Sequence, residues 1–167
     1  MKLESDISFE CESWSAIDHL DQLVDDALKA TVVEARKQLL DGAEVSLLFC
    51  DDARIRELNR DWRDLDKPTN VLSFPAVSAD RLATSPLLGD IAVAFETVSR
   101  ESKDEGKTLS HHTSHMIVHG LLHLLGYDHE TDEEAEEMEA LERAALARLG
   151  IADPYAATEP VNRKKAS

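Results

Sequence analysis

The sequence predicts an α+β fold in which a single domain contains a mixed four-stranded sheet packed against about five helices. The chain has 167 residues, which is the usual size of one domain. Hydrophobic residues make up 43% of it, enough to fill a core. Short apolar segments of strand length alternate along the chain with longer segments in which apolar residues recur at helical spacing. This interleaving of strands and helices favours a layered structure of helices on a sheet.

Four short segments are predicted to be the strands. Polar and apolar residues alternate over 7–11, and 45–50 is an apolar run of the length and composition of a buried strand. Residues 71–75 form the third strand, which Pro75 ends because proline cannot donate a hydrogen bond to a neighbouring strand. The fourth strand is Gly89–Ala94.

Five helices are predicted from the spacing of apolar residues and from their end signals. Acidic residues before the second helix and a capping box formed by Thr131 and Glu134 before the last one are typical helix starts. Gly126 and Gly150 are typical of helix ends. The predicted helices cover residues 17–40, about 51–63, 96–106, 109–125 and 131–149.

A single domain is expected to cover residues 1–153, and residues 154–167 are expected to form a polar, flexible tail. Between 75 and 88 lies a loop that is longer than most connections, which is a feature of functional loops.

The composition restricts the binding partners. Acids number 34 and bases 18, so the net charge is −16, and bulk attraction to nucleic acid or to an anionic membrane is excluded. The acids are unevenly spread, however, because nine of them and no base lie between residues 128 and 142. A local basic lining together with a divalent cation can therefore still hold a phosphate. Weak affinity for any free nucleic acid is expected.

The remaining composition points to the cytoplasm. Cys11 and Cys50 lie far apart and form neither a disulfide framework nor a zinc ribbon. The acidic N-terminus lacks the basic start of a signal peptide, and no segment approaches the roughly 18 apolar residues of a membrane span. We therefore expect a cytoplasmic protein with no membrane partner.

The chemistry is predicted to lie in the histidines. His119 and His123 are four residues apart, so they stand on one face of a helix and can point at one ion. Gly126 can adopt the left-handed conformation that ends the helix and turns the chain back, so that His129 approaches as a third ligand. Three neutral nitrogens with room for water are typical of a zinc site, here at the end of a helix.

Pairs of histidines at this spacing occur more often on ordinary helix surfaces or in cores than in metal sites, and His115 stands four residues before His119 as well. The third histidine beyond the glycine is what favours metal binding. The other members of the cluster are expected to be partly exposed residues of the first turns that line a cleft: His111, His112 and His115.

The histidine pattern also reproduces most of the metzincin protease pattern, in which a glutamate follows the first histidine and acts as the general base. Gly120 occupies that position here. A protease would therefore lack the group that deprotonates its water.

A second dense motif surrounds Arg63, at the end of a predicted helix. Its guanidinium has forked donors that match phosphate oxygens and stays charged at any working pH. From the residues alone, a surface arginine paired with Asp61, Asp64 or Asp66 is slightly favoured over a catalytic one.

Taken together, these blocks resemble the bacterial YbeY family of metal-dependent endoribonucleases. The resemblance runs from about Val45 to Leu149, and its histidine block is highly specific. Trp62 departs from the family, which usually has tyrosine there, so an aromatic body is kept and a hydroxyl is lost. The blocks that carry the resemblance are Leu58-Asn59, Trp62-Arg63, Thr69 to Pro75, Gly89-Asp90-Ile91 and His119 to Glu130.

The resemblance implies one zinc ion per chain, held by His119, His123 and His129, and makes Arg63 the essential arginine. It implies cleavage of single-stranded RNA, with no DNA expected as a substrate. The implied cellular role is 3′-end maturation of small-subunit (16S) ribosomal RNA and ribosome quality control. The implied partners are ribosomal RNA and the ribosome or ribosomal proteins.

The mechanism leaves several alternatives open. An ion can polarise a phosphodiester oxygen, activate a water, or do both, and the 2′-hydroxyl of the RNA is the alternative nucleophile. Asp128 either orients a neighbouring ligand histidine or is an ordinary turn residue. Two other functions compete: a metallopeptidase-like hydrolase, and a non-catalytic ribosome-assembly factor whose structural metal would take Cys50 or another side chain as its fourth ligand.

Overall fold

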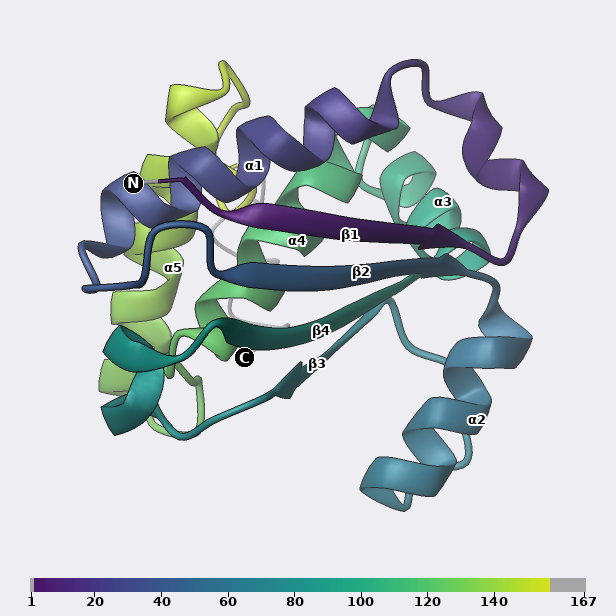
Figure 1. Cartoon of the computed structure of the whole chain (residues 1–167). Helices are drawn as coiled ribbons and strands as arrows, with labels where there is room; N and C mark the ends of the chain where they lie inside the picture. The colour runs from purple at the N-terminus through teal and green to yellow at the C-terminus, as the bar shows by residue number, and fades with distance from the viewer. Residues whose placement is uncertain (1, 157–167) are drawn as a thin grey trace.

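One mixed sheet organises the chain, as predicted. A computed structural model describes residues 2–156. The strands lie in the order β1, β2, β4, β3 (Figure 1), with β1, β2 and β4 parallel and β3 antiparallel to β4. The strand bounds are Glu4–Phe9 for β1, Glu44–Cys50 for β2, Val71–Pro75 for β3 and Leu87–Ala94 for β4.

Four of the five α-helices cover one face of the sheet. Helix α4 lies against β3 and β4, and α1, α3 and α5 pack around it. Val45, Leu47 and Phe49 point from β2 into this layer and are at most 1% exposed, so the main core lies between the sheet and these helices. The helix bounds are Leu20–Ala35 for α1, Phe95–Asp104 for α3, Leu109–Leu124 for α4 and Asp132–Arg148 for α5.

Helix α2 (Asp52–Arg63) lies over one end of the other face of the sheet (Figure 1). The Asp51 carboxylate caps it by accepting a hydrogen bond from the Arg54 backbone, 2.8 Å away. Ile55 packs into a second, small cluster on this face. Within the described residues, no helix covers the rest of this face, so the sheet is buried on one side and partly open on the other.

The main departures from the predicted elements are at helix ends and in the first strand, which was predicted over 7–11 and covers Glu4–Phe9. The helix predicted over 17–40 is α1, which ends at Ala35 because Arg36 takes a left-handed conformation with φ +54°. Two short 3-10 helices were not predicted: η1 (Glu12–Ala16), and η2 (Ala79–Thr84) within the long loop. The capping box of Thr131 and Glu134 is confirmed.

Most of the tail predicted for 154–167 lies outside the described residues, which end at 156. Tyr155, placed in that tail, contacts α5 through a 2.9 Å hydrogen bond to Glu142. Among residues 2–156, no helix has the length and apolar character needed to span a membrane.

Candidate metal centre

Three histidine rings meet at the C-terminal end of α4. His119 and His123 lie one turn apart on the helix, and their Nε2 atoms face each other at 3.1 Å. His129 comes from the following loop, and one nitrogen from each ring lies within 4.8 Å of the others. The structure thus brings together the three ligands that the sequence predicts.

Gly126 makes the reversal that brings His129 back. Its φ is +98°, a left-handed conformation that suits glycine. The Tyr127 N–H donates to the Leu122 carbonyl and the Gly126 N–H to the His123 carbonyl, both at 3.0 Å, which is the Schellman pattern of a helix end. The predicted role of this glycine is confirmed.

His123 has the protonation and orientation that a metal ligand needs. Burial, and then the charges of His119 and His129, lower the pKa of His123 to about 4, so its ring is neutral at physiological pH. A carbonyl oxygen can only accept, so His123 Nδ1 donates to Tyr127 O at 3.0 Å and leaves Nε2 free for an ion.

The spacing of the rings also fits. Two nitrogens bound tetrahedrally at roughly 2.0–2.1 Å from one zinc ion lie about 3.3 Å apart, close to the observed 3.1 Å. The carbonyl groups at the end of α4 give that end a partial negative charge, which favours a cation there.

The triad opens into a cavity of about 710 Å³ that Arg63 reaches from α2. The Arg63 guanidinium donates from Nη2 to the Ser73 carbonyl of β3 at 2.7 Å, which leaves its other N–H groups for a ligand. Other cavity residues come from α2, from the segment before β3 and from the histidine loop: Asn59, Lys67, Thr69, Asn70, Tyr127, Asp128 and Glu130.

Comparison with known proteins assigns the chain to a family. The family model described as endoribonuclease YbeY matches residues 6–150. The chain belongs to the endoribonuclease YbeY family. Endoribonuclease YbeY of Methylocella silvestris is 50% identical over 155 residues, which cover 93% of this chain and 87% of that protein. Endoribonuclease YbeY of Azorhizobium caulinodans is 51% identical over 154 residues, covering 92% and 97%.

A solved structure supports the fold of this YbeY-family chain. The solution structure of TM1509 from Thermotoga maritima superposes with a TM-score of 0.56 and covers 87% of this chain and 91% of its own. At 23% identity, the likeness concerns the fold alone.

A buried carboxylate, which we did not predict as a site residue, stands behind the triad. Glu142 of α5 is 1% exposed, and its Oε2 lies 2.5 Å from His115 Nε2 and 3.4 Å from His119 Nδ1. Its Oε1 accepts from the Tyr155 hydroxyl at 2.9 Å. Burial raises the pKa of Glu142, but the hydrogen bonds and charges of His115 and His119 outweigh it and lower the pKa to about 2. The sequence does contain one indication that this side chain is buried, because Glu142 falls on the inward-facing side of the last predicted helix.

Gly120 lies on the side of α4 that faces the sheet. A Cβ there would be 2.9 Å from Ile91 Cγ2 of β4, so the position is filled by close helix–sheet packing. The hydroxyl of Ser73 adds a 3.1 Å hydrogen bond to the Gly120 carbonyl, which fixes β3 against α4. A glutamate base could not occupy position 120 without displacing the helix from the sheet.

Two other predicted candidates take structural positions. The Asp128 carboxylate accepts from the backbone N–H of His129 at 2.8 Å, and within residues 2–156 it has no hydrogen bond to a histidine ring. Cys50 is buried beneath α2, outside the histidine group, and burial followed by the Asp51 charge raises its thiol pKa to about 12. A protonated thiol is not a metal ligand.

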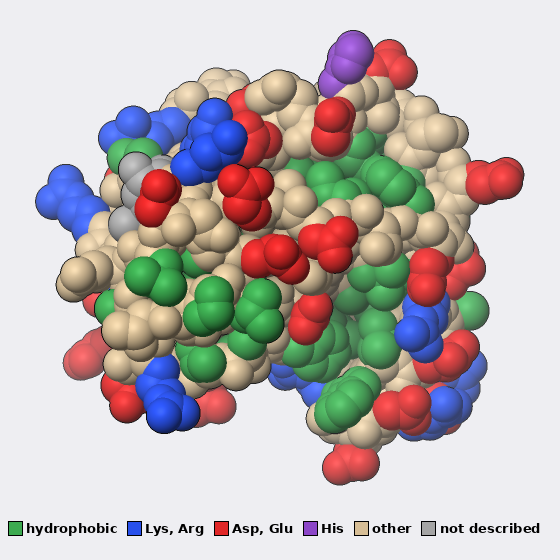
Figure 2. Space-filling model, in the orientation of Figure 1, with side chains coloured by type: hydrophobic (Ala, Val, Ile, Leu, Met, Phe, Trp, Pro, Cys, Tyr) green, Lys and Arg blue, Asp and Glu red, His purple; other side chains and the backbone are tan. Residues whose placement is uncertain are grey.

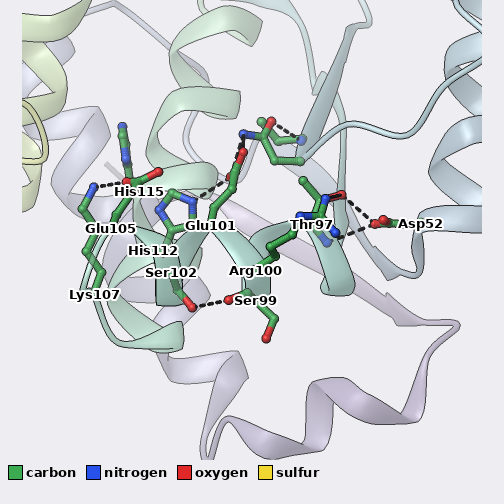
Figure 3. Close-up of polar contacts among 12 residues, drawn as sticks. Asp52, Thr97, Ser99, Arg100, Glu101, Ser102, Glu105, Lys107, His112 and His115 are labelled. Atoms are coloured by element: carbon green, nitrogen blue, oxygen red, sulfur yellow. Dashed lines mark hydrogen bonds and ion pairs between the residues drawn. The ribbon is translucent and has the colours of Figure 1, made fainter. Parts of the chain in front are cut away.

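The prediction that His112 and His115 are partly exposed is wrong: they are 3% and 8% exposed. His112 Nε2 lies 2.9 Å from Glu101 Oε1 (Figure 3). The Asn70 side chain donates to the same carboxylate at 3.0 Å. These bonds lower the pKa of Glu101, with His112 as the largest cause. They tie α3 and α4 to the segment before β3, one wall of the histidine cavity.

Proposed function

We propose that this endoribonuclease cleaves single-stranded RNA with one zinc ion per chain, held by His119, His123 and His129. The observation that carries the proposal is the convergence of three histidine nitrogens within 4.8 Å in a cavity that also contains an arginine. Zinc is favoured because three imidazoles with space for water are typical of catalytic zinc sites.

Arg63 binds and orients the phosphodiester at this centre. Its bond to the Ser73 carbonyl holds the guanidinium at the edge of β3, and its remaining donors stabilise negative charge that develops on the phosphoryl oxygens. A bound ion would supply Lewis-acid polarisation of a phosphodiester oxygen and would favour deprotonation of a water.

Glu142 is a positioning residue for His119. Its carboxylate accepts from His119 Nδ1, which directs the Nε2 lone pair of that ring toward His123. The Tyr127 carbonyl does the same for His123.

The proposed cellular role is maturation of the 3′ end of 16S ribosomal RNA and ribosome quality control, in the cytoplasm, with the ribosome or ribosomal proteins as partners. The resemblance to the family supports this role. The net charge of −16 supports a partner as well, because it weakens the attraction of free RNA, so recognition must come from the cavity and from neighbouring ribosomal components.

Metal content measured beside cleavage of a defined single-stranded RNA tests the proposal. His119→Ala and His123→Ala are expected to lose both zinc and cleavage, whereas Arg63→Ala is expected to keep zinc and lose cleavage. Lys103→Ala, which changes a cation outside the cavity, is the control and is expected to cleave like wild type. Full cleavage by the metal-free protein would refute the proposal. Identification of the product end groups distinguishes attack by water from attack by the 2′-hydroxyl.

A further inference from the structure

A second cavity of about 720 Å³ lies on the open face of the sheet, beside α2. Figure 2 looks onto this face, and hydrophobic side chains fill the hollow between the sheet and α2. Its apolar lining comes from β2, α2, β3 and β4: Leu48, Leu58, Trp62, Phe74 and Ala92.

This cavity adjoins the histidine cavity. Arg63, Ser73 and Pro75 line both, so the two meet at the edge strand β3. Trp62 and Arg63 are consecutive residues in the last turn of α2. An RNA strand whose phosphate binds Arg63 can therefore place the group next to that phosphate in the second cavity.

The Trp62 side chain lies at the surface as a flat aromatic platform and is not part of the core. Its side chain is 72% exposed, so it contributes little burial to folding. It packs edge-on against Phe74, with ring centroids 6.4 Å apart, and the Arg63 guanidinium lies 5.7 Å from the centre of the same Phe74 ring. Two aromatic rings and a guanidinium plane thus stand together beside the proposed site of cleavage.

Resting on the proposed function, we infer that this second cavity binds one unpaired base of the RNA, next to the phosphate held at Arg63, by stacking on Trp62. Aromatic side chains bind bases of single strands in this way with little regard to sequence, because every base has a π face. The aromatic ring does the binding, and a hydroxyl is not required.

The charges of the open face favour a base rather than the RNA backbone as the occupant. Ser46 of β2 pairs with Asp6 of β1 and with Asp90 of β4, so two carboxylates flank one row of the sheet. Acidic side chains are scattered across the same face in Figure 2. Phosphates are repelled from it, so the backbone stays at the β3 edge while an uncharged base turns inward.

Kinetics on RNA with a single missing base test the inference. A defined single-stranded RNA is compared with versions that carry one abasic nucleotide at successive positions around the cleaved bond. One abasic position, adjacent to that bond, is expected to lower kcat/KM by about 5- to 30-fold in the zinc-loaded wild type. Trp62→Ala is expected to lose a similar factor on intact RNA and to lose nothing further on that abasic RNA.

Matched variants separate stacking from simple apolar contact. Trp62→Phe and Trp62→Tyr are expected to keep most of the wild-type kcat/KM, and Trp62→Leu is expected to lose it. Phe9→Ala is the control, because Phe9 is a 56% exposed aromatic on β1 that lines neither cavity. Equal activity of Trp62→Leu and Trp62→Phe would overturn the inference.

Fluorescence gives a readout that does not depend on cleavage. Trp14 is 1% exposed and donates to the Cys50 carbonyl at 3.0 Å, so only Trp62 is open to a ligand. Single-stranded RNA is expected to quench wild-type emission and to leave Trp62→Phe unchanged. Wild-type cleavage by Trp62→Ala, with binding to the small ribosomal subunit impaired instead, would overturn the inference in favour of a protein partner. Absence of RNA cleavage by the wild-type protein would refute only the proposed function.

Discussion

Replacement of Glu142 by glutamine tests whether the carboxylate behind the triad tunes the metal site. Glutamine has the size of glutamate and keeps one oxygen that can accept from the histidine rings, but it carries no charge. The substitution therefore removes the electrostatic support of His119 without opening a cavity. The Tyr155 hydroxyl, which donates to Oε1 in the native protein, can accept from the new amide instead.

The geometry sets the size of the effect. Loss of a carboxylate that orients a metal-binding histidine costs about 10- to 100-fold in metal affinity. The 3.4 Å distance from Glu142 to His119 Nδ1 is long for a hydrogen bond, whereas the contact with His115 is 2.5 Å. The lower end of the range is therefore expected, about tenfold in Kd or about 1.4 kcal/mol.

Zinc titration of the apoprotein against a chromogenic chelator at fixed pH measures this change. Glu136→Gln is the control, because it removes the same charge from an exposed position of the same helix and is expected to leave Kd within about twofold. Circular dichroism and the urea midpoint establish that each variant is folded. A folded Glu142→Gln variant with the zinc affinity of wild type would refute the positioning role.

Three further perturbations test the packing around the site. Gly120→Ala places a Cβ 2.9 Å from Ile91. The overpacking is expected to lower the free energy of unfolding by about 1–3 kcal/mol, which outweighs the roughly 1 kcal/mol gained in helix propensity. An increase in the urea midpoint would contradict this expectation. Gly126→Ala, at φ +98°, is expected to cost about 1–2 kcal/mol and to weaken zinc binding, and unchanged zinc affinity would show that the turn does not place the third ligand. Glu101→Gln is expected to be less stable than wild type at pH 7. The pKa of Glu101 is lowered in the folded state, so its stabilisation is present above the unfolded pKa of about 4.3 and disappears as pH falls through the folded value. Urea unfolding at pH 7 and near pH 3 measures the difference in stability, and a difference that does not change with pH would contradict the expected stabilisation by the Glu101 carboxylate.

The sequence predicts the histidine triad well because the triad is local. His119, His123 and Gly126 follow one another within a helix and its end, where spacing alone determines which side chains share a face. The strand β3 is predicted at its exact bounds, Val71–Pro75, because a β-branched start and a proline end define it. Only short-range rules are needed in both cases.

Other parts of the site depend on packing between distant segments. Glu142 lies 23 residues from His119 in sequence, and only the packing of α5 against α4 turns one acid of a long acidic stretch inward. Arg63 reaches the cavity of the triad because α2 packs beside β3 and β4 at the edge of the sheet. No local sequence pattern reveals this packing. The ring of His115 is buried for the same reason, since its partner is Glu142.

The charge of the chain and its substrate are reconciled by how the arginines of α2 are used. Arg54 pairs with Glu10, Arg56 with Asp66 and Arg60 with Asp61, so three of the four cations of this helix are neutralised by carboxylates. Within residues 2–156, Arg63 forms no ion pair and bonds only a backbone carbonyl. The charges of the first three arginines are thus compensated, and only the Arg63 charge remains uncompensated on this helix, beside three histidines that suit a divalent cation. An acidic protein built in this way attracts phosphate at its proposed reaction centre and repels it elsewhere, so local charge rather than net charge selects the substrate.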